Sequence, residues 1–328
     1  MPPPVRIVTA DRGDAGLRLD LVLRRHLADV DAATRTRVQT WIENGQVTVN
    51  GVPVRRTAAR AALGDVVMVA LPATAPRTAM GAEDVPLNIL YEDNYLLAVD
   101  KPAGVVVHPS YRNVAGTIMN ALLWHARTWS RGQRPSLVGR LDKGTSGILV
   151  VAKTAASHAA LQRTMASSAT EKDYLVVVYG HVKMARGDIK LRLGTDPMDR
   201  RRRVASSTVG APSLTRFERL ARVAAPRAGL SLLRCRLVTG RTHQIRAHLT
   251  ARNWPPVGDT VYGEPRWTMI VDPMLAATLR AFPRQALHAW RLAFVHPVTN
   301  HRVLLEAPLP RDFDGLLTAA GFSPRDIL

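Results

Sequence analysis

The sequence has a single cysteine, Cys235, and it has no long apolar run. One cysteine excludes an intrachain disulfide framework and is typical of a protein from a reducing compartment. A membrane-spanning helix needs about 20 consecutive apolar residues, and no stretch of this chain is that long. Residues 1–6 also lack the apolar core of a secretory signal peptide. We therefore expect a cytoplasmic protein without a membrane partner.

Acidic residues are scarce relative to basic ones. The chain has 26 Asp and Glu against 45 Lys and Arg, which gives a formal net charge of +19. Such a surplus favours a polyanionic partner, with nucleic acid ahead of an anionic membrane surface. Charge by itself does not exclude a basic protein without such a partner. The length of 328 residues indicates about two domains, and a hydrophobic fraction of 46% is ordinary for a globular core.

Several catalytic signatures are absent as well. No His and Cys cluster has the spacing of a metal site, and no Gly-rich phosphate loop or Ser-His-Asp spacing stands out. A zinc deaminase needs a Pro-Cys-x-x-Cys segment, which one cysteine cannot supply. His243 and His248 are five residues apart, which turns them off a common helix face and argues against a zinc pair. We expect no metal and no cofactor, and a metal-dependent nuclease or deaminase is disfavoured.

The first part of the chain predicts two helices followed by a strand hairpin. Residues 1–15 contain three consecutive prolines and are interpreted as an extended arm. One helix is expected from Arg18 and a second over residues 34–43, each with one apolar face. Residues 47–54 read Val-Thr-Val-Asn-Gly-Val-Pro-Val, which is typical of two short strands joined by a two-residue turn. Residues 16–72 are therefore expected to form one small α/β domain.

The remainder of the chain predicts a larger domain over residues 86–328. Residues 73–85 have no periodicity and are expected to be a linker. After a Pro-Gly turn at residues 102–104, a strand is expected to end at Pro109. Other apolar, β-branched runs predict strands at residues 89–91, 96–99, 148–151, 171–180 and 232–237, and helical patterns cover residues 117–127 and 157–165.

The segment from Gly139 to Thr154 reads GRLDKGTSGILVVAKT and carries one acid, Asp142. A turn rich in Gly, Thr and Ser leads directly into a short apolar run that is typical of a buried strand. Asp142 would therefore lie on a loop held against a rigid sheet, where catalytic groups are common. From spacing alone, a turn acid that hydrogen-bonds its own backbone is the more frequent explanation.

This segment resembles the signature loop of the RluA family of pseudouridine synthases, in which the Asp of the Arg-Leu-Asp triplet is catalytic. The family usually has His at the position of Gly139 and an acid at the position of Gly144. The resemblance implies that Asp142 starts the reaction. It also implies that Arg140 takes the space that the extruded base leaves.

Three further segments carry the same resemblance. The sequence Lys-Asp-Tyr ending at Tyr174 implies that this ring stacks on the target base. The sequence Gly-Arg-Thr-His-Gln-Ile-Arg ending at Arg246 implies that this guanidinium pairs with Asp142. The closing motif around Leu287 implies an apolar wall against the flipped base. Without the resemblance, a core aromatic is the preferred explanation for Tyr174, and Leu287 can be a core leucine as well as a wall of the site.

Residues 16–72 resemble a small RNA-binding domain of the ribosomal-protein type, sometimes called the alpha-L domain. The marks are Arg18-Leu19-Asp20, the hairpin between Gly45 and Gly51, and Gly64-Asp65. The alternative is a solvated charged face on an ordinary helical hairpin. Contacts in such a domain go mainly to phosphates, which position a protein without reading sequence. The expected RNA-binding residues are Arg18, Arg35, Arg37, Lys143 and Arg241.

Together the resemblances imply an α+β protein. The larger domain would have the pseudouridine synthase fold, with a mixed, largely antiparallel sheet flanked by helices. The implied activity is isomerisation of uridine to pseudouridine in structured RNA. The base is extruded, its bond from N1 to the sugar breaks, and carbon 5 rejoins the sugar. Whether Asp142 attacks covalently or removes a sugar proton stays open.

The partner implied by the resemblances is RNA, with large-subunit ribosomal RNA favoured over transfer RNA. A monomer is expected. The rival from another class is an RNA-binding or ribosome-assembly protein without turnover. Turnover on RNA labelled at carbon 5 of uracil discriminates between these two classes.

Overall fold

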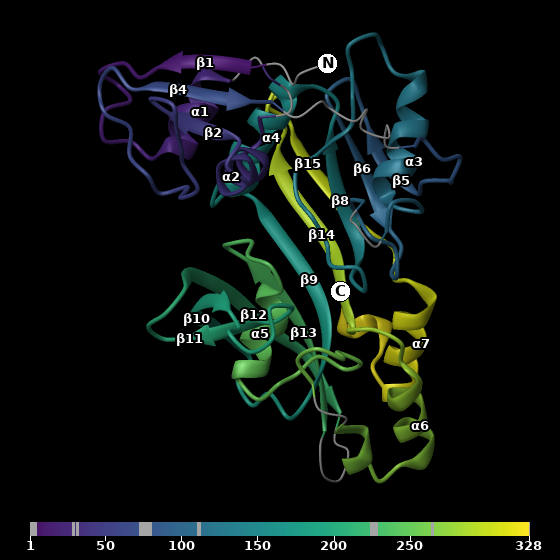
Figure 1. Cartoon of the computed structure of the whole chain (residues 1–328). Coiled ribbons are helices and arrows are strands. Elements are labelled where there is room, and N and C mark those ends of the chain that lie inside the picture. The colour runs from purple at the N-terminus through teal and green to yellow at the C-terminus, as the bar shows by residue number, and fades with distance from the viewer. Residues whose placement is uncertain are drawn as a thin grey trace. The chain divides into compact units, whose positions relative to one another are not determined.

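The computed structural model describes residues 5–27, 30, 33–71, 81–109, 113–223, 229–263 and 266–327. The chain divides into two compact units, residues 1–79 and 80–328. Figure 1 shows the first unit in purple and blue and the second from blue to yellow. Most of the linker expected at residues 73–85 lies outside the described residues, apart from residues 81–85.

The first unit packs two helices against a four-stranded antiparallel sheet of order β1-β4-β2-β3. Its core contains Leu23 and Trp41 from the helices and Val67 from the sheet. Asn50 and Gly51 have φ of 51° and 82°, which is the left-handed geometry that a tight two-residue hairpin turn needs. The predicted helices and hairpin are confirmed. The elements are β1 (Val5–Thr9), α1 (Leu19–His26), α2 (Arg35–Glu43), β2 (Val47–Val49), β3 (Val52–Pro53) and β4 (Val66–Ala70).

Strand β1 corrects the interpretation of residues 1–15 as an arm. Val5–Thr9 pairs antiparallel with β4 along its whole length, from Val5 opposite Ala70 to Thr9 opposite Val66. Only Val8 of this strand is buried, so the segment shows almost no inward periodicity in the sequence. An edge strand with a single inward side chain gives too weak a pattern to be recognised.

The second unit is built on one mixed sheet of order β11-β10-β12-β13-β9-β14-β8-β6-β5, with β15 beside β14 and β7 beside β8. All pairings between its described strands are antiparallel except that of β8 with β14. The predicted mixed, largely antiparallel sheet flanked by helices is confirmed (Figure 1). The strands are β5 (Ile89–Glu92), β6 (Leu96–Lys101), β7 (Ser136–Leu137), β8 (Ser146–Ala152), β9 (Glu171–Tyr179), β10 (Arg186–Thr195), β11 (Arg203–Ser206), β12 (Ala211–Val223), β13 (Leu230–Leu237), β14 (Leu287–Val295) and β15 (Arg302–Glu306).

Helices cover both faces of the sheet. Strand β9 alternates between them, since Leu175 packs in the cluster that includes α6 and α7, whereas Val176 packs in the cluster that includes α5. Central strands of this kind are buried on both faces and therefore read as continuous apolar runs. Among the described residues, no helix combines the length and apolar character that crossing a membrane requires. The helices are α3 (Ile118–His125), α4 (Ala155–Ala166), α5 (Gln244–Ala251), α6 (Pro273–Ala281) and α7 (Arg311–Ala320).

The strand expected to end at Pro109 is absent, because residues 102–109 form turns and loop after β6. A buried cation organises this segment instead of a partner strand. The Lys101 ammonium, with none of its surface exposed, donates to the carbonyl oxygens of Pro102 at 2.6 Å, Val105 at 3.0 Å and Lys143 at 3.3 Å. Three carbonyls satisfy the three protons of one ammonium group.

Candidate active site

Asp142 lies on the loop between β7 and β8, as its sequence predicts. The Asp142 side chain is 18% exposed. The backbone amide of Thr145 donates to the backbone carbonyl oxygen of Asp142 at 3.0 Å. The loop is held from outside as well as by its own turn. Gly104 N and Lys101 Nζ both donate to Lys143 O, and Arg284 Nη1 donates to Gly144 O at 3.0 Å. Asp142 is therefore fixed against the sheet by segments that are distant in sequence.

The two glycines that depart from the family pattern have different surroundings. At Gly139 a Cβ atom would meet nothing within 4 Å, so this position is open. At Gly144 a Cβ atom would lie 2.4 Å from Gln285 Oε1. The buried Gln285 amide occupies that space and donates to Thr145 Oγ1 at 3.1 Å. Gly144 thus leaves room for the Gln285 side chain. Gln285 lies just before β14 and stabilises the Asp142 loop through Thr145.

Arg246 pairs with Asp142 in the structure, as the resemblance implied. Its Nη1 donates to Asp142 Oδ2 at 2.9 Å, and its side chain is 5% exposed. The other edge of the guanidinium donates through Nε and Nη2 to both oxygens of Asp259, at 2.7 and 2.8 Å. Burial alone lowers the pKa of Arg246, but the carboxylates of Asp259 and Asp142 outweigh it and raise that pKa above its ordinary value. A fixed guanidinium of this kind orients the carboxylate it binds.

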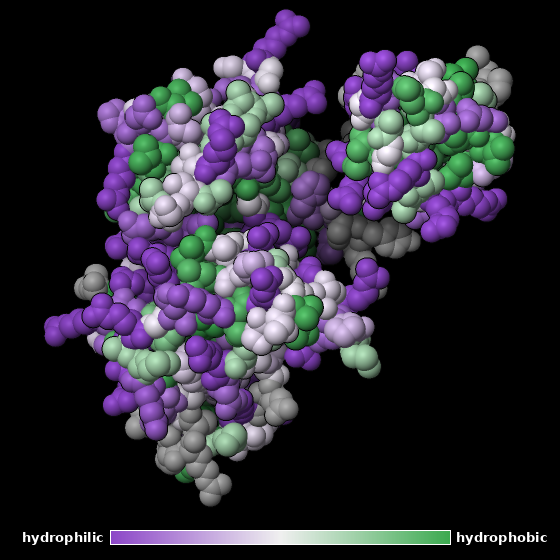
Figure 2. Space-filling model, turned by 90° about the vertical axis from the view of Figure 1, so that its left-hand side faces the viewer, coloured by the Kyte–Doolittle hydropathy of each residue, from purple (hydrophilic) through white to green (hydrophobic). Residues whose placement is uncertain are grey.

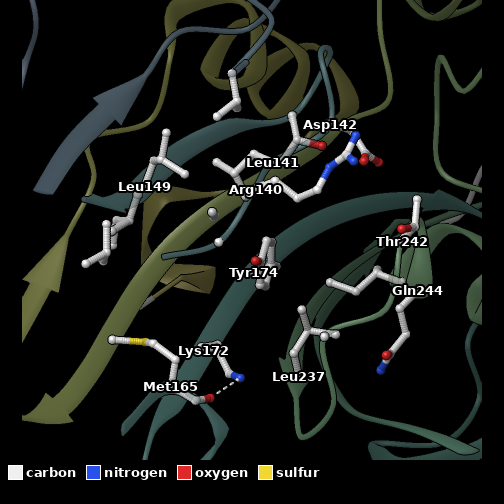
Figure 3. Close-up of a pocket in the computed structure, with 18 of the residues that line it drawn as sticks. Arg140, Leu141, Asp142, Leu149, Met165, Lys172, Tyr174, Leu237, Thr242 and Gln244 are labelled. Atoms are coloured by element: carbon white, nitrogen blue, oxygen red, sulfur yellow. Dashed lines mark hydrogen bonds between the residues drawn. The ribbon is translucent and has the colours of Figure 1, made fainter. Parts of the chain in front are cut away.

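Tyr174 and Leu287 lie in the same cavity as Asp142. Tyr174 is on β9 and Leu287 begins the neighbouring strand β14, in which Ala289 lies opposite Tyr174. Burial, and then the negative charge of Asp142, raise the pKa of the Tyr174 phenol, so its hydroxyl stays protonated. In Figure 3, Tyr174 lies at the centre, with Asp142 on one side and Lys172 and Met165 on the other. The cavity has a volume of about 1200 Å³.

The other predicted contact residues fall into two groups. Arg140, Lys143 and Arg241 line the same cavity and are exposed. Arg35 and Arg37 are exposed on α2 of the first unit. Arg18 caps the start of α1 and forms a two-pronged ion pair with the buried Asp20. The structure therefore brings the predicted residues of the second unit to one cavity, whereas the three arginines belong to the first unit.

Three residues around Asp142 received no predicted role. Asp259 holds Arg246, His243 Nε2 lies 3.6 Å from Asp142 Oδ1, and Tyr262 Oη lies 3.0 Å from His243 Nδ1. The sequence Gly258-Asp259 with Tyr262-Gly263 continues the family pattern, which was the available signal for these residues. Their roles depend on contacts between segments far apart in the chain, which spacing does not show.

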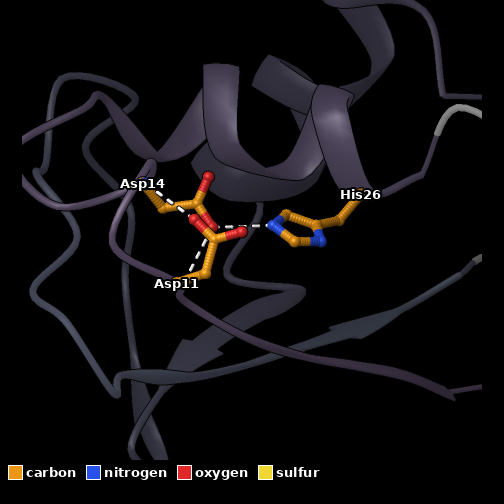
Figure 4. Close-up of side chains that lie close together, drawn as sticks. All are labelled: Asp11, Asp14 and His26. Carbon is orange, nitrogen blue, oxygen red and sulfur yellow. Dashed lines mark hydrogen bonds and ion pairs between the residues drawn. The ribbon is translucent and has the colours of Figure 1, made fainter.

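A second cluster of ionisable groups lies in the first unit, where Asp11, Asp14 and His26 lie close together (Figure 4). The fully buried Asp14 contacts His26 Nε2 at 2.7 Å and Arg25 Nη1 at 2.9 Å, and Arg25 Nη2 binds Asp11 at 2.9 Å. A guanidinium bound to both carboxylates repels a cation. This network therefore joins α1 to the loop that precedes it, as an ion-pair brace.

The chain is similar to known proteins along most of its length. A family profile described as RNA pseudouridylate synthase matches residues 95–251, and an S4 domain profile matches residues 17–67. The chain is 40% identical over 305 residues to a ribosomal large subunit pseudouridine synthase D of Nitrosomonas europaea, covering 93% of this chain and 85% of the relative. It is 37% identical to the protein with the same title from Pseudomonas aeruginosa, covering 92% of each chain.

Solved structures show the same fold. A human protein titled RNA pseudouridylate synthase domain containing 1 aligns with a TM-score of 0.53 at 25% identity, covering 74% of this chain and 98% of that one. The human domain containing 4 protein aligns with a TM-score of 0.55 at 21% identity, covering 71% and 92%. The fold and the family match define an RNA-modifying isomerase. The chain belongs to the RNA pseudouridine synthases and carries an S4 domain ahead of its catalytic unit.

Proposed function

We propose that this enzyme isomerises uridine in large-subunit ribosomal RNA and that Asp142 starts the reaction. The observation that carries the proposal is the contact of 2.9 Å between Asp142 Oδ2 and Arg246 Nη1 inside the cavity lined by Tyr174 and Leu287. The choice of RNA rests on the titles of the relatives that match over most of their length. Work on ribosomal RNA supports a cytoplasmic location.

Each residue of the cavity has a distinct part in the proposal. The bond from N1 of uracil to C1′ of ribose breaks, and a bond from carbon 5 to C1′ forms. Carbon 5 loses a proton and N1 gains one, so atoms balance without an external leaving group. Asp142 initiates the first step, either at C1′ or by removing a proton from the sugar. Tyr174 and Leu287 hold the uracil between an aromatic and an apolar surface while it turns.

RNA contacts surround this cavity in the proposal. A base in a stem must leave the stack before it enters the cavity, and Arg140 fills the space it leaves. Lys143 and Arg241, exposed at the cavity, bind the neighbouring phosphates. Arg18, Arg35 and Arg37 of the S4 domain bind phosphates of the same RNA. We propose that the enzyme acts as a monomer, as expected from the sequence.

The test uses ribosomal RNA that carries tritium at carbon 5 of uracil. Wild-type enzyme is expected to release tritium, because carbon 5 loses its hydrogen when it bonds to the sugar. Asp142→Asn is expected to abolish release while RNA affinity stays within about twofold, since the amide keeps the shape but loses the charge. Release by Asp142→Asn would contradict the role of Asp142.

The same assay separates the alternatives for substrate and class. No release from ribosomal RNA, with release from transfer RNA, would show that the proposed substrate is wrong. Tight binding without release from either RNA would favour a ribosome-assembly protein. Mapping the modified uridine in the tritium-depleted RNA then identifies the target site.

A further inference from the structure

His243 is the second side chain that faces the Asp142 carboxylate. Its Nε2 lies 3.6 Å from Asp142 Oδ1, while Arg246 holds the other oxygen. His243 precedes α5 with φ 57° and ψ 20°, which is left-handed backbone that a residue with a side chain rarely adopts. Such strained positions cluster at functional sites, where the surrounding structure enforces them. Here the strain places the imidazole between Asp142 and Tyr262.

Tyr262 contacts both groups that face Asp142. It is 6% exposed, its hydroxyl oxygen lies 3.0 Å from His243 Nδ1, and its ring lies edge-on to the imidazole at 5.5 Å. The Arg246 guanidinium lies 5.0 Å from the centre of the same ring. Burial raises the pKa of the Tyr262 phenol, so the hydroxyl keeps its proton. Tyr262 is thus a buried donor next to the imidazole.

The hydrogen bonds of Tyr262 determine which nitrogen of His243 carries the proton. The hydroxyl oxygen accepts the backbone N–H of Arg203 at 2.6 Å. Among the described residues, the remaining polar neighbour at hydrogen-bonding distance from that hydroxyl is His243 Nδ1. With the Arg203 N–H on the hydroxyl oxygen, the hydroxyl proton is available for donation to an unprotonated Nδ1. A neutral imidazole then has its hydrogen on Nε2, directed at Asp142.

We propose that His243 is a positioning residue for Asp142 and that Tyr262 sets its tautomer. The inference rests on the proposed role of Asp142. The guanidinium of Arg246 binds one carboxylate oxygen and the N–H of Nε2 faces the other, so that a hydrogen bond from Nε2 would restrict rotation of the carboxylate. The separation of 3.6 Å must shorten by about 0.5 Å for a hydrogen bond, a change typical of active sites that tighten when substrate binds.

Burial, more than the surrounding charges, favours the neutral form of the His243 imidazole near physiological pH. Burial lowers its pKa and is the largest effect; the two carboxylates raise that pKa, and the arginines lower it. Protonation would convert the contact into an ion pair with Asp142 and weaken that carboxylate as a nucleophile or base. The charged and titratable groups that face His243 are Asp142 before β8, Arg246 on α5, Asp259 and Tyr262 in the segment after α5, and Arg203 on β11.

The first experiment measures the tautomer directly in the full-length protein. Nitrogen-15 NMR of the imidazoles, with His243→Gln used to assign the signals, is expected to show hydrogen on Nε2 and an unprotonated Nδ1 at pH 7.5. Tyr262→Phe removes the hydroxyl that contacts Nδ1 and accepts the Arg203 N–H, and is expected to give a mixture of the two tautomers. Hydrogen on Nδ1 of the wild type would overturn the inference. This readout does not depend on turnover.

The second experiment measures tritium release against pH. Tyr262→Phe is expected to lower kcat about tenfold with little change in KM for RNA, and to move the acidic limb of the profile to higher pH, because Nδ1 becomes free to take a proton. His243→Gln, which keeps an N–H, is expected to be more active than His243→Ala and to lose that limb. The exposed His301→Gln serves as the control and is expected to behave as wild type.

Two kinetic results would also overturn the inference. One is a Tyr262→Phe profile identical to that of the wild type. The other is equal activity of His243→Gln and His243→Ala in variants whose folds are shown intact by circular dichroism. Turnover by Asp142→Asn would instead contradict the proposed function and would leave the measured tautomer of His243 unaffected.

Discussion

Asp142 is held by side chains from three distant segments of the chain. Lys101 and Arg284 bind carbonyl oxygens of its loop, and Arg246 binds its carboxylate. Each of these groups is a buried cation, and a buried cation is stable only where fixed acceptors replace water. The carbonyls and carboxylates of the site supply those acceptors. The same contacts that satisfy the cations therefore fix the Asp142 loop.

Gly144 gives a test of this bracing at the residue scale. Gly144→Ala would place a Cβ atom 2.4 Å from Gln285 Oε1, so the Gln285 amide must move and lose its bond to Thr145. We expect a loss of about 1–2 kcal/mol in unfolding free energy. Urea unfolding measures it.

A double-mutant cycle with Gln285→Ala supplies the control for this prediction. The two substitutions are expected to be less costly together than the sum of each, because the clash disappears with the amide. Gly139→Ala, in open space, is expected to change stability by less than about 0.5 kcal/mol. Additive costs at Gly144 and Gln285 would show that the two residues do not compete for the space.

At the scale of elements, the parallel pairing of β8 with β14 connects the Asp142 loop to the segment that begins at Leu287. Ser146 lies opposite His288 and Gly147 opposite Ala289, directly after the Asp142 loop and the Leu287 position. A Cβ atom at Gly147 would lie 2.2 Å from the carbonyl oxygen of Ala289, and Gly147 has φ of 107°, so only glycine fits this junction. The close approach sets the spacing between the two sides of the cavity.

His288 makes this strand pair sensitive to acid. Its Nδ1 lies 3.0 Å from Ser146 Oγ, none of its surface is exposed, and burial lowers its pKa to about 4. The unfolded chain has an ordinary histidine pKa near 6.5 and therefore binds a proton at a higher pH than the folded chain does. The stabilisation is present in full above pH ~6.5 and is lost as the pH falls from ~6.5 towards 4.

Titration of His288 should therefore lower the free energy of unfolding by up to about 1.4 kcal/mol for each pH unit as the pH falls from ~6.5 towards 4. Unfolding in urea at pH 7.5, 6 and 5 measures the slope. His288→Gln is expected to be less stable at pH 7.5 but to show a shallower dependence on pH. The exposed His301→Gln is expected to keep the wild-type slope, and an unchanged slope in His288→Gln would disprove the assignment.

At the scale of the whole molecule, the excess of basic residues lies on an outer surface that is largely hydrophilic. Figure 2 shows one face of the molecule, on which hydrophilic residues predominate and hydrophobic residues occur in small groups. Arg24, Arg35 and Arg37 are exposed on the helices of the S4 domain. An S4 domain with this charge is suited to the backbone of structured RNA, where affinity comes from the release of counterions.

Substitution of these three arginines tests the proposed role of the S4 domain. Arg24, Arg35 and Arg37 changed together to Gln should weaken RNA binding and make the slope of log affinity against log salt shallower by about 2–3, since each duplex phosphate contact contributes about 0.9. Fluorescence anisotropy between 50 and 200 mM salt measures the slope. The matched change of all three to Lys keeps the charge and is expected to keep the slope. Equal slopes for all three proteins would show that this surface does not contact the RNA.

The sequence by itself determined the local elements and the motif residues. Runs of β-branched residues, the Asn-Gly turn and the apolar helix faces depend on neighbours in the chain, so β8, β9, α2 and the first hairpin were predictable. The resemblance of the Asp142 segment also gave the class of enzyme, which the comparisons confirm. The basic composition pointed to a polyanionic partner.

Tertiary structure alone decided how the site is assembled. Edge strand β1 has one buried residue and becomes a strand only by pairing with β4, 57 or more residues further along the chain. The contacts of Lys101, Gln285, Asp259 and His243 join groups from separate segments, and no local pattern encodes them. Buried polar groups must find partners wherever the fold provides them. Their pairing follows from the packing of the sheet, and it places the donors around Asp142.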